Sequence, residues 1–406
     1  MAGRIVKDVV IAGGGVIGMS VAFNLTKFID PSRICVLEPE PTYVRSASAL
    51  SWASIRQQFS LAENIKLSQS SIKFIKEIDQ HLRVPGDEDV VDIHYKHGSY
   101  LFLAREEDAD RLETNIAVQK EANVKVHRYN QSELKEKYPY LNLEDIVLGS
   151  DCGEDEGWFD PWLLLSAYKN KIKSLGVDIV TCRVTGFNPD KSLLVHDLKT
   201  NRTQTLHYSK FVNSTGIHAK FTNNLLNSAL SSDSRFNLPV TPQRHYTFNI
   251  ACKEGPSDLP LTLCPLKTVI RSEGPNYIVK SSAGTFVDDE EELKDFGDVD
   301  DANFIEDIWE NLAYRIPAFE ATKILGGWVG YYEYNTLDQN ALIGPHPAIP
   351  DHYFINGFSG HGIQQSPAAG QCLAEIMCGV QPHLDISNLS LDRVVENRPY
   401  MERNIY

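Results

Sequence analysis

The sequence lacks an excess of basic residues and a recognisable pattern of cysteines. Its 39 lysines and arginines are outnumbered by 54 aspartates and glutamates, which gives a formal net charge of −15. Because nucleic-acid phosphates are bound by clustered positive charge, this balance argues against a nucleic-acid partner. The seven cysteines are scattered and never occur in C-x-x-C spacing. This distribution fits a reducing compartment, and it predicts neither a disulfide framework nor a metal site.

Long uninterrupted apolar runs are also missing. Residues 9–25 come closest, but three consecutive glycines and Asn24 interrupt the run, so we predict a phosphate-binding loop there and no transmembrane segment. Only about six residues precede the first expected strand, and no secretion signal or arginine-rich transit peptide is visible among them. The chain has 406 residues, 42% of them hydrophobic and 23% charged. That is enough to bury a large core, divided over roughly two or three domains.

A glycine loop follows the first run of strand-forming residues. Gly13, Gly15 and Gly18 have G-x-G-x-x-G spacing, and a helical segment follows them. The first glycine permits the tight turn, the second lets a pyrophosphate approach the backbone, and the third lets helix and strand pack closely. A second short strand ends in Glu38, whose carboxylate can accept hydrogen bonds from a ribose hydroxyl. The pattern predicts a dinucleotide-binding β-α-β unit over residues 5–45.

The rest of the chain alternates predicted helices and strands. Apolar residues at helical spacing predict helices over 65–82 and 106–122. Asp160 as N-cap and Pro161 at the first helical position predict the start of another helix. We expect strands over 98–104, 177–180, 211–213 and within 240–285, and a last helix over 367–378.

A second glycine-rich loop lies near the other end of the chain, over Gly357–Gly362, and we expect a proline-started helix after it. Glycines there would let backbone N–H groups and a helix N-terminus approach the pyrimidine end of a flavin and stabilise negative charge on it. The loop resembles the C-terminal flavin loop of the glycine/D-amino acid/sarcosine oxidase superfamily. Residues 338–345 are similar to the superfamily segment that precedes that loop.

This resemblance implies an α/β fold with two discontinuous domains. A Rossmann-type FAD-binding domain of the glutathione-reductase-like kind would comprise residues 1–93, 150–236 and 326–406. A smaller α+β substrate domain would comprise residues 94–149 and 237–325 and would cover the face of the flavin.

Five further segments resemble, within this superfamily, a subgroup of mitochondrial flavoproteins associated with the assembly of respiratory complex I (NADH dehydrogenase). The resemblance implies residence on the matrix side of the inner membrane, although no presequence is visible, and complex I subunits or assembly intermediates as partners. The segments are Arg56–Ser60, Glu63–Ile65, Glu154–Trp162, Arg315–Glu320 and Gly330–Asn335.

The superfamily resemblance also implies a set of FAD contacts. The first loop would hold the pyrophosphate, Glu38 the adenosine ribose, Val184 the adenine, and the second loop the flavin ring. Tyr331 looks to occupy the position of the cysteine that links flavin covalently in sarcosine oxidases, so we expect non-covalent FAD. The implied contacts are Gly13, Gly15, Val16, Ile17, Gly18, Glu38, Ser46, Ser48, Val184, Gly216, Gly360, His361, Gly362 and Ile363.

Four residues are candidates for catalysis. Arg56 matches the arginine that binds substrate carboxylate in sarcosine oxidases, a role that suits its planar fork; the alternative is pairing with a surface acid. Gln364 stands where those enzymes have a second, positively charged carboxylate ligand, so a carboxylate would bind more weakly here. Lys280 is a candidate oxygen-activating cation beside the flavin, or else a structural residue. His361 is either an acid–base group or a structural hydrogen-bonding residue.

Three functions remain open at this point. The first is a flavoprotein that supports complex I assembly. The second is an oxidase or dehydrogenase acting on the CH–NH or CH–NH2 group of secondary or tertiary amino acids such as sarcosine or dimethylglycine. The third, a nicotinamide-dependent dehydrogenase, would share only the first loop.

Overall fold

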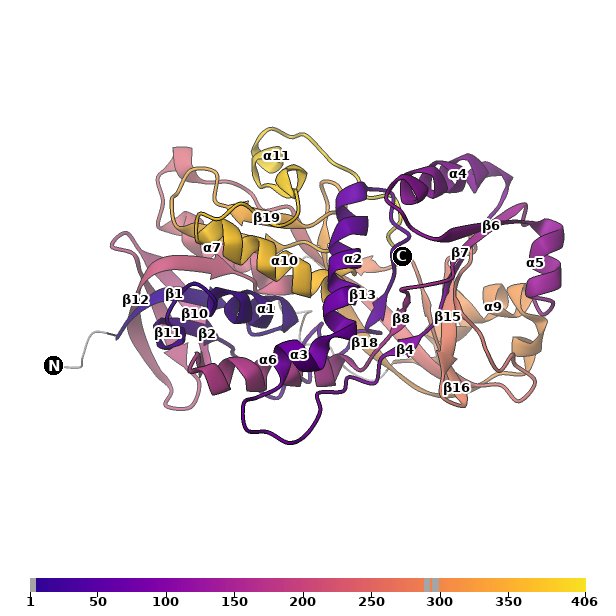
Figure 1. The fold of residues 1–406 in the computed structure, drawn as a ribbon, viewed down its shortest axis with the longest axis horizontal. Coiled ribbons are helices and arrows are strands. Elements are labelled where there is room, and N and C mark those ends of the chain that lie inside the picture. The colour runs from indigo at the N-terminus through magenta and orange to yellow at the C-terminus, as the bar shows by residue number, and fades with distance from the viewer. Residues whose placement is uncertain (1–4, 288–292, 294–298) are drawn as a thin grey trace.

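Two large sheets lie side by side in the computed structural model, which describes residues 5–287, 293 and 299–406 (Figure 1). Within these ranges the first sheet has eight strands in the order β10-β11-β12-β1-β2-β9, and β20, which carries β19, also pairs with β12. Its centre is parallel, because β1 pairs in parallel with β2 and β12, and β12 with β20. The strands are β1 (Ile5–Ala12), β2 (Ile34–Leu37), β9 (Asp178–Val180), β10 (Cys182–Asn188), β11 (Ser192–Asp197), β12 (Arg202–Asn213), β19 (Leu342–Pro345) and β20 (His352–Asn356).

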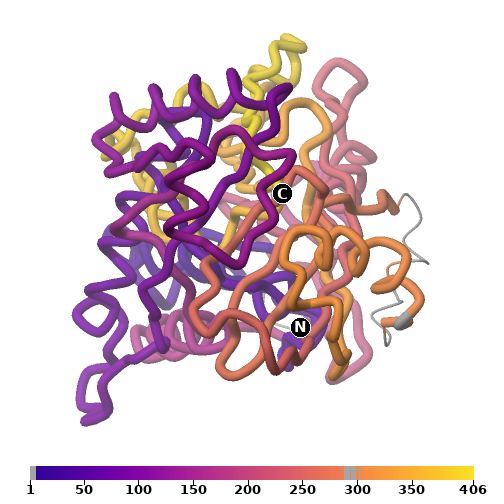
Figure 2. The backbone as a smooth tube through the Cα atoms, turned by 90° about the vertical axis from the view of Figure 1, so that its right-hand side faces the viewer, coloured from indigo at the N-terminus to yellow at the C-terminus, as the bar shows by residue number. Residues whose placement is uncertain are grey.

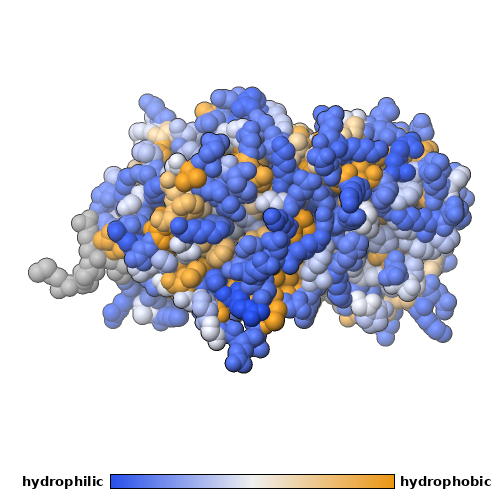
Figure 3. Space-filling model, in the orientation of Figure 1, coloured by the Kyte–Doolittle hydropathy of each residue, from blue (hydrophilic) through white to orange (hydrophobic). Residues whose placement is uncertain are grey.

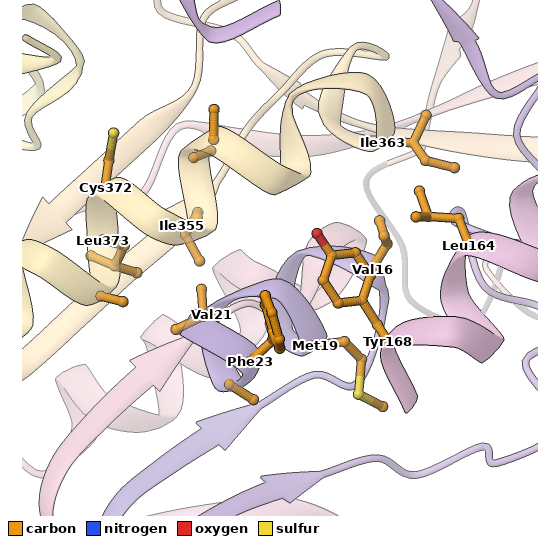
Figure 4. Close-up of a cluster of buried hydrophobic side chains, with 14 of the residues drawn as sticks. Val16, Met19, Val21, Phe23, Leu164, Tyr168, Ile355, Ile363, Cys372 and Leu373 are labelled. Atoms are coloured by element: carbon orange, nitrogen blue, oxygen red, sulfur yellow. The ribbon is translucent and has the colours of Figure 1, made fainter. Parts of the chain in front are cut away.

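Both faces of β1 are buried over its second half, Val9–Ala12. Val9 and Ile11 belong to one core, whereas Val10 and Ala12 belong to a second core on the opposite face. This explains why its second half, Val9–Ala12, reads as a continuous apolar run rather than an alternating one. Figure 4 shows the first core, with side chains of α1 between those of α6 and α10. The helices around this sheet are α1 (Val16–Leu25), α2 (Ala62–Lys76), α3 (Ile78–Leu82), α6 (Pro161–Leu175), α7 (Ala219–Ser228), α10 (Gly362–Met377) and α11 (Asp392–Val395).

The second sheet is largely antiparallel. Nine of its strands lie in the described ranges, in the order β17-β13-β16-β15-β14-β5-β7-β6, with β18 paired to β13. The strands are β5 (Tyr100–Ala104), β6 (Val126–Asn130), β7 (Leu148–Cys152), β13 (Val240–Ala251), β14 (Leu261–Leu263), β15 (Thr268–Glu273), β16 (Asn276–Ser281), β17 (Thr285–Phe286) and β18 (Lys323–Asn335). Its helices are α4 (Glu106–Glu121), α5 (Gln131–Lys137), α8 (Asp301–Phe304) and α9 (Glu310–Arg315), with a π-helical turn at Ile305–Trp309.

A small third sheet connects the two. It consists of β3 (Ser54–Ile55), β8 (Gly157–Trp158) and β4 (Lys96–His97), in the order β3-β8-β4. The short 3-10 helices of the described chain are Pro31–Arg33, Gly216–His218, Ser232–Ser234, Pro317–Ala321 and Ser387–Leu389.

The predicted fold class is confirmed, since the chain forms an α/β unit with a central parallel sheet beside a mixed, strand-rich unit. Asp160 caps α6 as expected: its carboxylate accepts hydrogen bonds from the backbone N–H groups of Trp162 and Leu163. The division into two discontinuous domains stays a prediction, because sheet membership alone does not set a domain boundary. The second sheet draws its strands from residues 100–152 and 240–335.

Two predicted helix boundaries are wrong. The helix predicted over 65–82 is divided into α2 and α3, because the backbone leaves helical geometry at Glu77, with φ −103° and ψ 19°. The last helix begins at Gly362, so Pro367 lies inside it. The proline cannot donate a backbone hydrogen bond, but Ser366 Oγ donates to the Ile363 carbonyl oxygen at 2.9 Å and satisfies that acceptor.

Residues 402–406 lie within the body of the molecule, close to segments from the first 150 residues (Figures 1 and 2). The backbone N–H of Arg403 donates to Ser60 Oγ at 2.9 Å, for example. The face of the molecule in Figure 3 is largely hydrophilic, with apolar residues in scattered patches. None of the helices in the described ranges combines the length and the apolar character needed to cross a membrane.

Candidate functional site

The first glycine loop is tightly packed between β1 and α1. Gly13 has φ +101°, and a Cβ there would lie 2.2 Å from the Ser214 carbonyl oxygen. A Cβ at Gly18 would lie 2.0 Å from the Gly13 carbonyl oxygen, so the close approach of helix and strand requires glycine at both positions. Gly15 is the N-cap of α1 and has no side chain that could cap the helix. The first turn of α1 therefore offers backbone donors and the positive end of its dipole to an anion.

Glu38 lies directly against this loop. Its Oε2 accepts a hydrogen bond from the Gly14 backbone N–H at 2.9 Å, and its Oε1 accepts one from the Glu40 N–H at 2.7 Å. Burial raises the pKa of the Glu38 carboxyl above its usual value, although these two donors act in the opposite direction. The carboxylate is thus held in place at the position where a ribose ligand is expected.

Four further residues are predicted to contact FAD. Ser48 Oγ accepts a hydrogen bond from the Val16 N–H at 3.0 Å, and Ser46 Oγ accepts one from the Ser48 N–H at 3.1 Å. Val184 lies in β10 and belongs to the core on the far face of β1. Gly216, with φ +58°, begins the turn after β12.

One cavity adjoins both glycine loops. The first loop contributes Val16 and Ile17, and Ser48 lies beside them. The second loop, which connects β20 to α10, contributes Gly360–Gln364. Gly360 has φ +96°, and a Cβ there would lie 2.4 Å from the ring of Tyr332, so only glycine fits the turn. Gly13, Gly15, Gly18, Glu38, Ser46, Val184 and Gly216 are not among the residues that line this cavity.

His361 is buried in the wall of this cavity. Both of its ring nitrogens lack a hydrogen-bond partner among the residues that the structure describes. Burial, together with the nearby Arg56 charge, lowers the pKa of His361 to about 3, so the imidazole is neutral at physiological pH. Its ring lies 5.4 Å from Phe59 and 6.1 Å from Phe358, centroid to centroid. A neutral imidazole with free nitrogens beside two glycine loops is better suited to hydrogen-bonding a polar edge of a cofactor than to acting as an acid catalyst.

Arg56 is buried and its guanidinium bonds within the chain. It donates to the carbonyl oxygens of Gln58 and Asn404 and lies 3.8 Å from the centre of the Phe59 ring. Its backbone N–H donates to Gln364 Oε1 at 2.9 Å. The two residues predicted to bind a substrate carboxylate are therefore adjacent, and the guanidinium is paired with backbone carbonyls rather than with a surface acid.

Lys280 lies on the same cavity and is also paired within the chain. Its Nζ donates to the Tyr332 hydroxyl and to the Tyr406 backbone oxygen, the latter at 3.1 Å. His245 packs on the Tyr332 ring at 4.2 Å, and burial together with the Lys280 charge holds its pKa well below its usual value. Tyr331, the residue expected at the covalent-linkage position, lines the cavity as well. The four predicted catalytic residues, Arg56, Lys280, His361 and Gln364, thus share one cavity.

Sequence reasoning missed the segment 402–406, which forms part of the cavity wall through Ile405 and Tyr406. The buried Glu402 anchors the segment: its Oε1 accepts from the Ser60 N–H at 2.9 Å and the Ser60 hydroxyl at 2.7 Å, and its Oε2 accepts from Asn64 Nδ2 at 2.9 Å. The segment carries no motif, and its partners lie more than 300 residues away in the sequence. No local pattern could have indicated its position.

Glu333 is a second residue that sequence reasoning missed. It lies in β18, lines the cavity, and has a buried Oε2 without a hydrogen-bond partner in the described structure. Burial raises the pKa of its carboxyl to about 7, so it exchanges a proton near physiological pH. The available signal was its place in the segment Gly330–Asn335, which carries part of the subgroup resemblance.

The chain is similar to known proteins both in sequence and in fold. The family model described as FAD dependent oxidoreductase matches residues 8–376. The chain is 37% identical over 427 residues to FAD-dependent oxidoreductase domain-containing protein 1 of Xenopus laevis, covering 98% of this chain and 84% of that protein. Among solved structures, L-proline dehydrogenase from P. horikoshii aligns with a TM-score of 0.80 at 21% identity, covering 98% of this chain and 100% of that one. Glycine oxidase from Geobacillus kaustophilus aligns with a TM-score of 0.77 at 19% identity, covering 96% and 99%.

Proposed function

Because the chain belongs to the family of FAD-dependent oxidoreductases, with FAD as its cofactor, we propose that it is a flavoprotein that supports the assembly of respiratory complex I and does not oxidise free amino acids. The family match confirms the predicted cofactor and favours FAD over nicotinamide. The role in assembly, the matrix side of the inner mitochondrial membrane and the complex I partners are part of the proposal. They follow from the subgroup resemblance of segments such as Glu154–Trp162.

The residues of the two loops suit this cofactor. FAD supplies two-electron redox chemistry when it is bound. The first turn of α1 would bind the pyrophosphate, and Glu38 would bind the ribose. The unpartnered nitrogens of His361 and the turn at Gly360 would adjoin the flavin end. Non-covalent binding remains a prediction, based on Tyr331 at the linkage position.

One observation favours assembly over amino-acid oxidation: the cations of the cavity are already paired within the chain. The Arg56 guanidinium donates to two backbone carbonyls, and Lys280 Nζ donates to the backbone oxygen of Tyr406. A substrate carboxylate would have to displace these acceptors, and a hydrogen bond to a charged group is worth about 1.5–3 kcal/mol. Gln364 supplies no charge in compensation. Small amino acids should therefore bind weakly.

The assembly role is tested in cells from which this protein has been removed. Blue-native gels of their mitochondria should show less assembled complex I, and re-expression of the wild-type chain should restore it. A Glu38→Ala variant, which should hold FAD less tightly, measures whether the flavin is needed for that restoration. Normal complex I in the absence of the protein would contradict the proposal.

A second candidate function is oxidation of secondary or tertiary amino acids. It is favoured because Arg56, Lys280 and Gln364 line one cavity. Arg56 and Gln364 stand where a substrate carboxylate is expected to bind, and Lys280 stands where an oxygen-activating cation is expected. If this function is the right one, turnover of sarcosine or dimethylglycine should be measurable as hydrogen peroxide release or dye reduction. Arg56→Ala should then lower the rate roughly ten- to a hundredfold, from the loss of a charge-assisted bond.

A further inference from the structure

Three side chains of the metal-ligating kind meet at the C-terminal half of α10. Cys372 and Glu375 lie one helical turn apart on α10, and the chain reverses at Gly379, with φ +70°, to bring His383 back beside them. One potential ligand atom from each residue lies within 4.8 Å of the other two. Figure 4 shows the Cys372 side chain on the side of α10 that points away from α1. None of the three residues lines the cavity described above.

The spacing of the three atoms is close to that of a tetrahedral zinc site. Cys372 Sγ lies 3.6 Å from His383 Nδ1, and Nδ1 lies 3.0 Å from Glu375 Oε2. Zinc bonds of about 2.3 Å to sulfur and about 2.1 Å to nitrogen and oxygen, at tetrahedral angles, require S···N of about 3.6 Å and N···O of about 3.4 Å. The first distance already fits, and the second has to open by only about 0.4 Å.

Each of the three side chains also has a hydrogen-bond partner outside the cluster, as metal ligands commonly do. These contacts fix the carboxylate, the imidazole and the thiol, and Glu375 Oε2 is further positioned by the His383 backbone N–H at 2.8 Å. The outer partners are Gln371 Nε2 on Glu375 Oε1 at 2.8 Å, Ser70 Oγ at 3.4 Å from His383 Nε2, and the Leu384 backbone N–H on the Cys372 thiol.

We propose that Cys372, Glu375 and His383 form a binding site for a zinc ion. The ion takes Sγ, Nδ1 and Oε2; the thiol proton passes to solvent, and the imidazole that binds through Nδ1 keeps its proton on Nε2. The His383 side chain is 27% exposed, so solvent can reach the site and supply a water as fourth ligand. The bound ion links the helix that follows the flavin loop to residues 380–384. Sequence spacing did not predict it, because C-x-x-E followed by a distant histidine matches no familiar zinc pattern.

The test is a zinc titration of the flavin-loaded protein after metal removal with a chelator. A chromophoric zinc indicator as competitor should report one tight site per chain, and bound zinc should raise the melting temperature. His383→Ala removes the most exposed of the three ligands and should weaken binding at least tenfold, and Cys372→Ser should do the same. Cys378→Ser is the matched control, since that cysteine follows α10 but lies outside the cluster; it should bind zinc as the wild type does.

Cobalt provides a readout that does not depend on folding of the serine variant. A cobalt-loaded wild-type protein should show a thiolate-to-metal charge-transfer band, and the His383→Ala protein should not show it at the same cobalt concentration. Absence of a stoichiometric zinc site in the wild type would overturn the proposal. Equal zinc affinity in the wild type and His383→Ala would overturn it too, because the ion would then be adventitious.

Discussion

Arg56 carries a buried positive charge at the cavity, and this charge is paired within the chain. Its guanidinium lies under Phe59 and donates to two carbonyl oxygens, one of them 348 residues away in the sequence. Its main physical role in this structure is to hold the segment 402–406 against the cavity. In that sense it is a positioning residue, and any role in substrate binding would require the segment to move.

Arg56→Ala should therefore destabilise the protein, because two charge-assisted hydrogen bonds are lost together with the ring contact. We expect the free energy of unfolding to fall by about 3 kcal/mol, measured by urea denaturation followed by circular dichroism. Arg398→Ala is the control: this residue is exposed, pairs with Glu396, and should leave the urea midpoint unchanged. A midpoint equal to that of the wild type in Arg56→Ala would show that the buried guanidinium contributes nothing to the fold.

Glu333 should make stability depend on pH. Burial raises the pKa of its carboxyl from 4.5 to about 7, so the folded state binds the proton more tightly than the unfolded state does. The stabilisation is complete below pH 4.5 and is lost as pH rises through 7. Glu333→Gln should remove this contribution, so the wild type should lose about 1–3 kcal/mol more than the variant between pH 4.5 and pH 8. Parallel urea curves for the two proteins across this range would contradict the prediction.

At the scale of elements, the segment 402–406 is fixed by the buried carboxylate of Glu402. Four donors meet this carboxylate: the Ser60 N–H and hydroxyl, Asn64 Nδ2 and the Asn404 N–H. Such a number of bonds makes the segment a permanent wall rather than a mobile flap. Glu402 is therefore one of the main residues, with Arg56, that hold this wall in front of the cavity.

Glu402→Ala should loosen this wall. We expect faster backbone hydrogen exchange over residues 402–406, and about tenfold tighter binding of a small carboxylate such as benzoate, read from the perturbed flavin absorbance. The gain corresponds to about 1.4 kcal/mol, the order of one charge-assisted bond no longer in competition. Glu396→Ala, an exposed acid in the same part of the chain, should change neither quantity. If both variants bind benzoate as the wild type does, the wall does not limit access.

The elements differ in how far the sequence could predict them. The loop of Gly13, Gly15 and Gly18 could be predicted, because its turn and its close helix–strand contact depend on neighbouring residues. The start of α10 could not, since Ser366 compensates locally for the missing donor of Pro367. The wall formed by residues 402–406 could not be predicted either. Its hydrogen bonds to Ser60 and Asn64 join residues that are far apart in the sequence and come together only in the folded protein.

At the scale of the whole molecule, the two large sheets and the segment 402–406 enclose one cavity. The parallel sheet brings both glycine loops to it, the second sheet brings Lys280 and Glu333, and the segment 402–406 lies against Arg56. This arrangement supports a flavoprotein with a cavity whose cations, Arg56 and Lys280, are paired within the chain. It is consistent with the family match, and the paired cations carry the proposal that small amino acids are not substrates.

The most direct measurement is the absorbance of the purified flavoprotein during anaerobic titration with sarcosine, dimethylglycine and related secondary and tertiary amino acids. If the cavity cations are committed to the chain as described, the oxidised flavin bands should persist throughout, while dithionite should bleach them. Bleaching by any of these amino acids at sub-millimolar concentration would contradict the account and establish amino-acid oxidation as the function of the cavity.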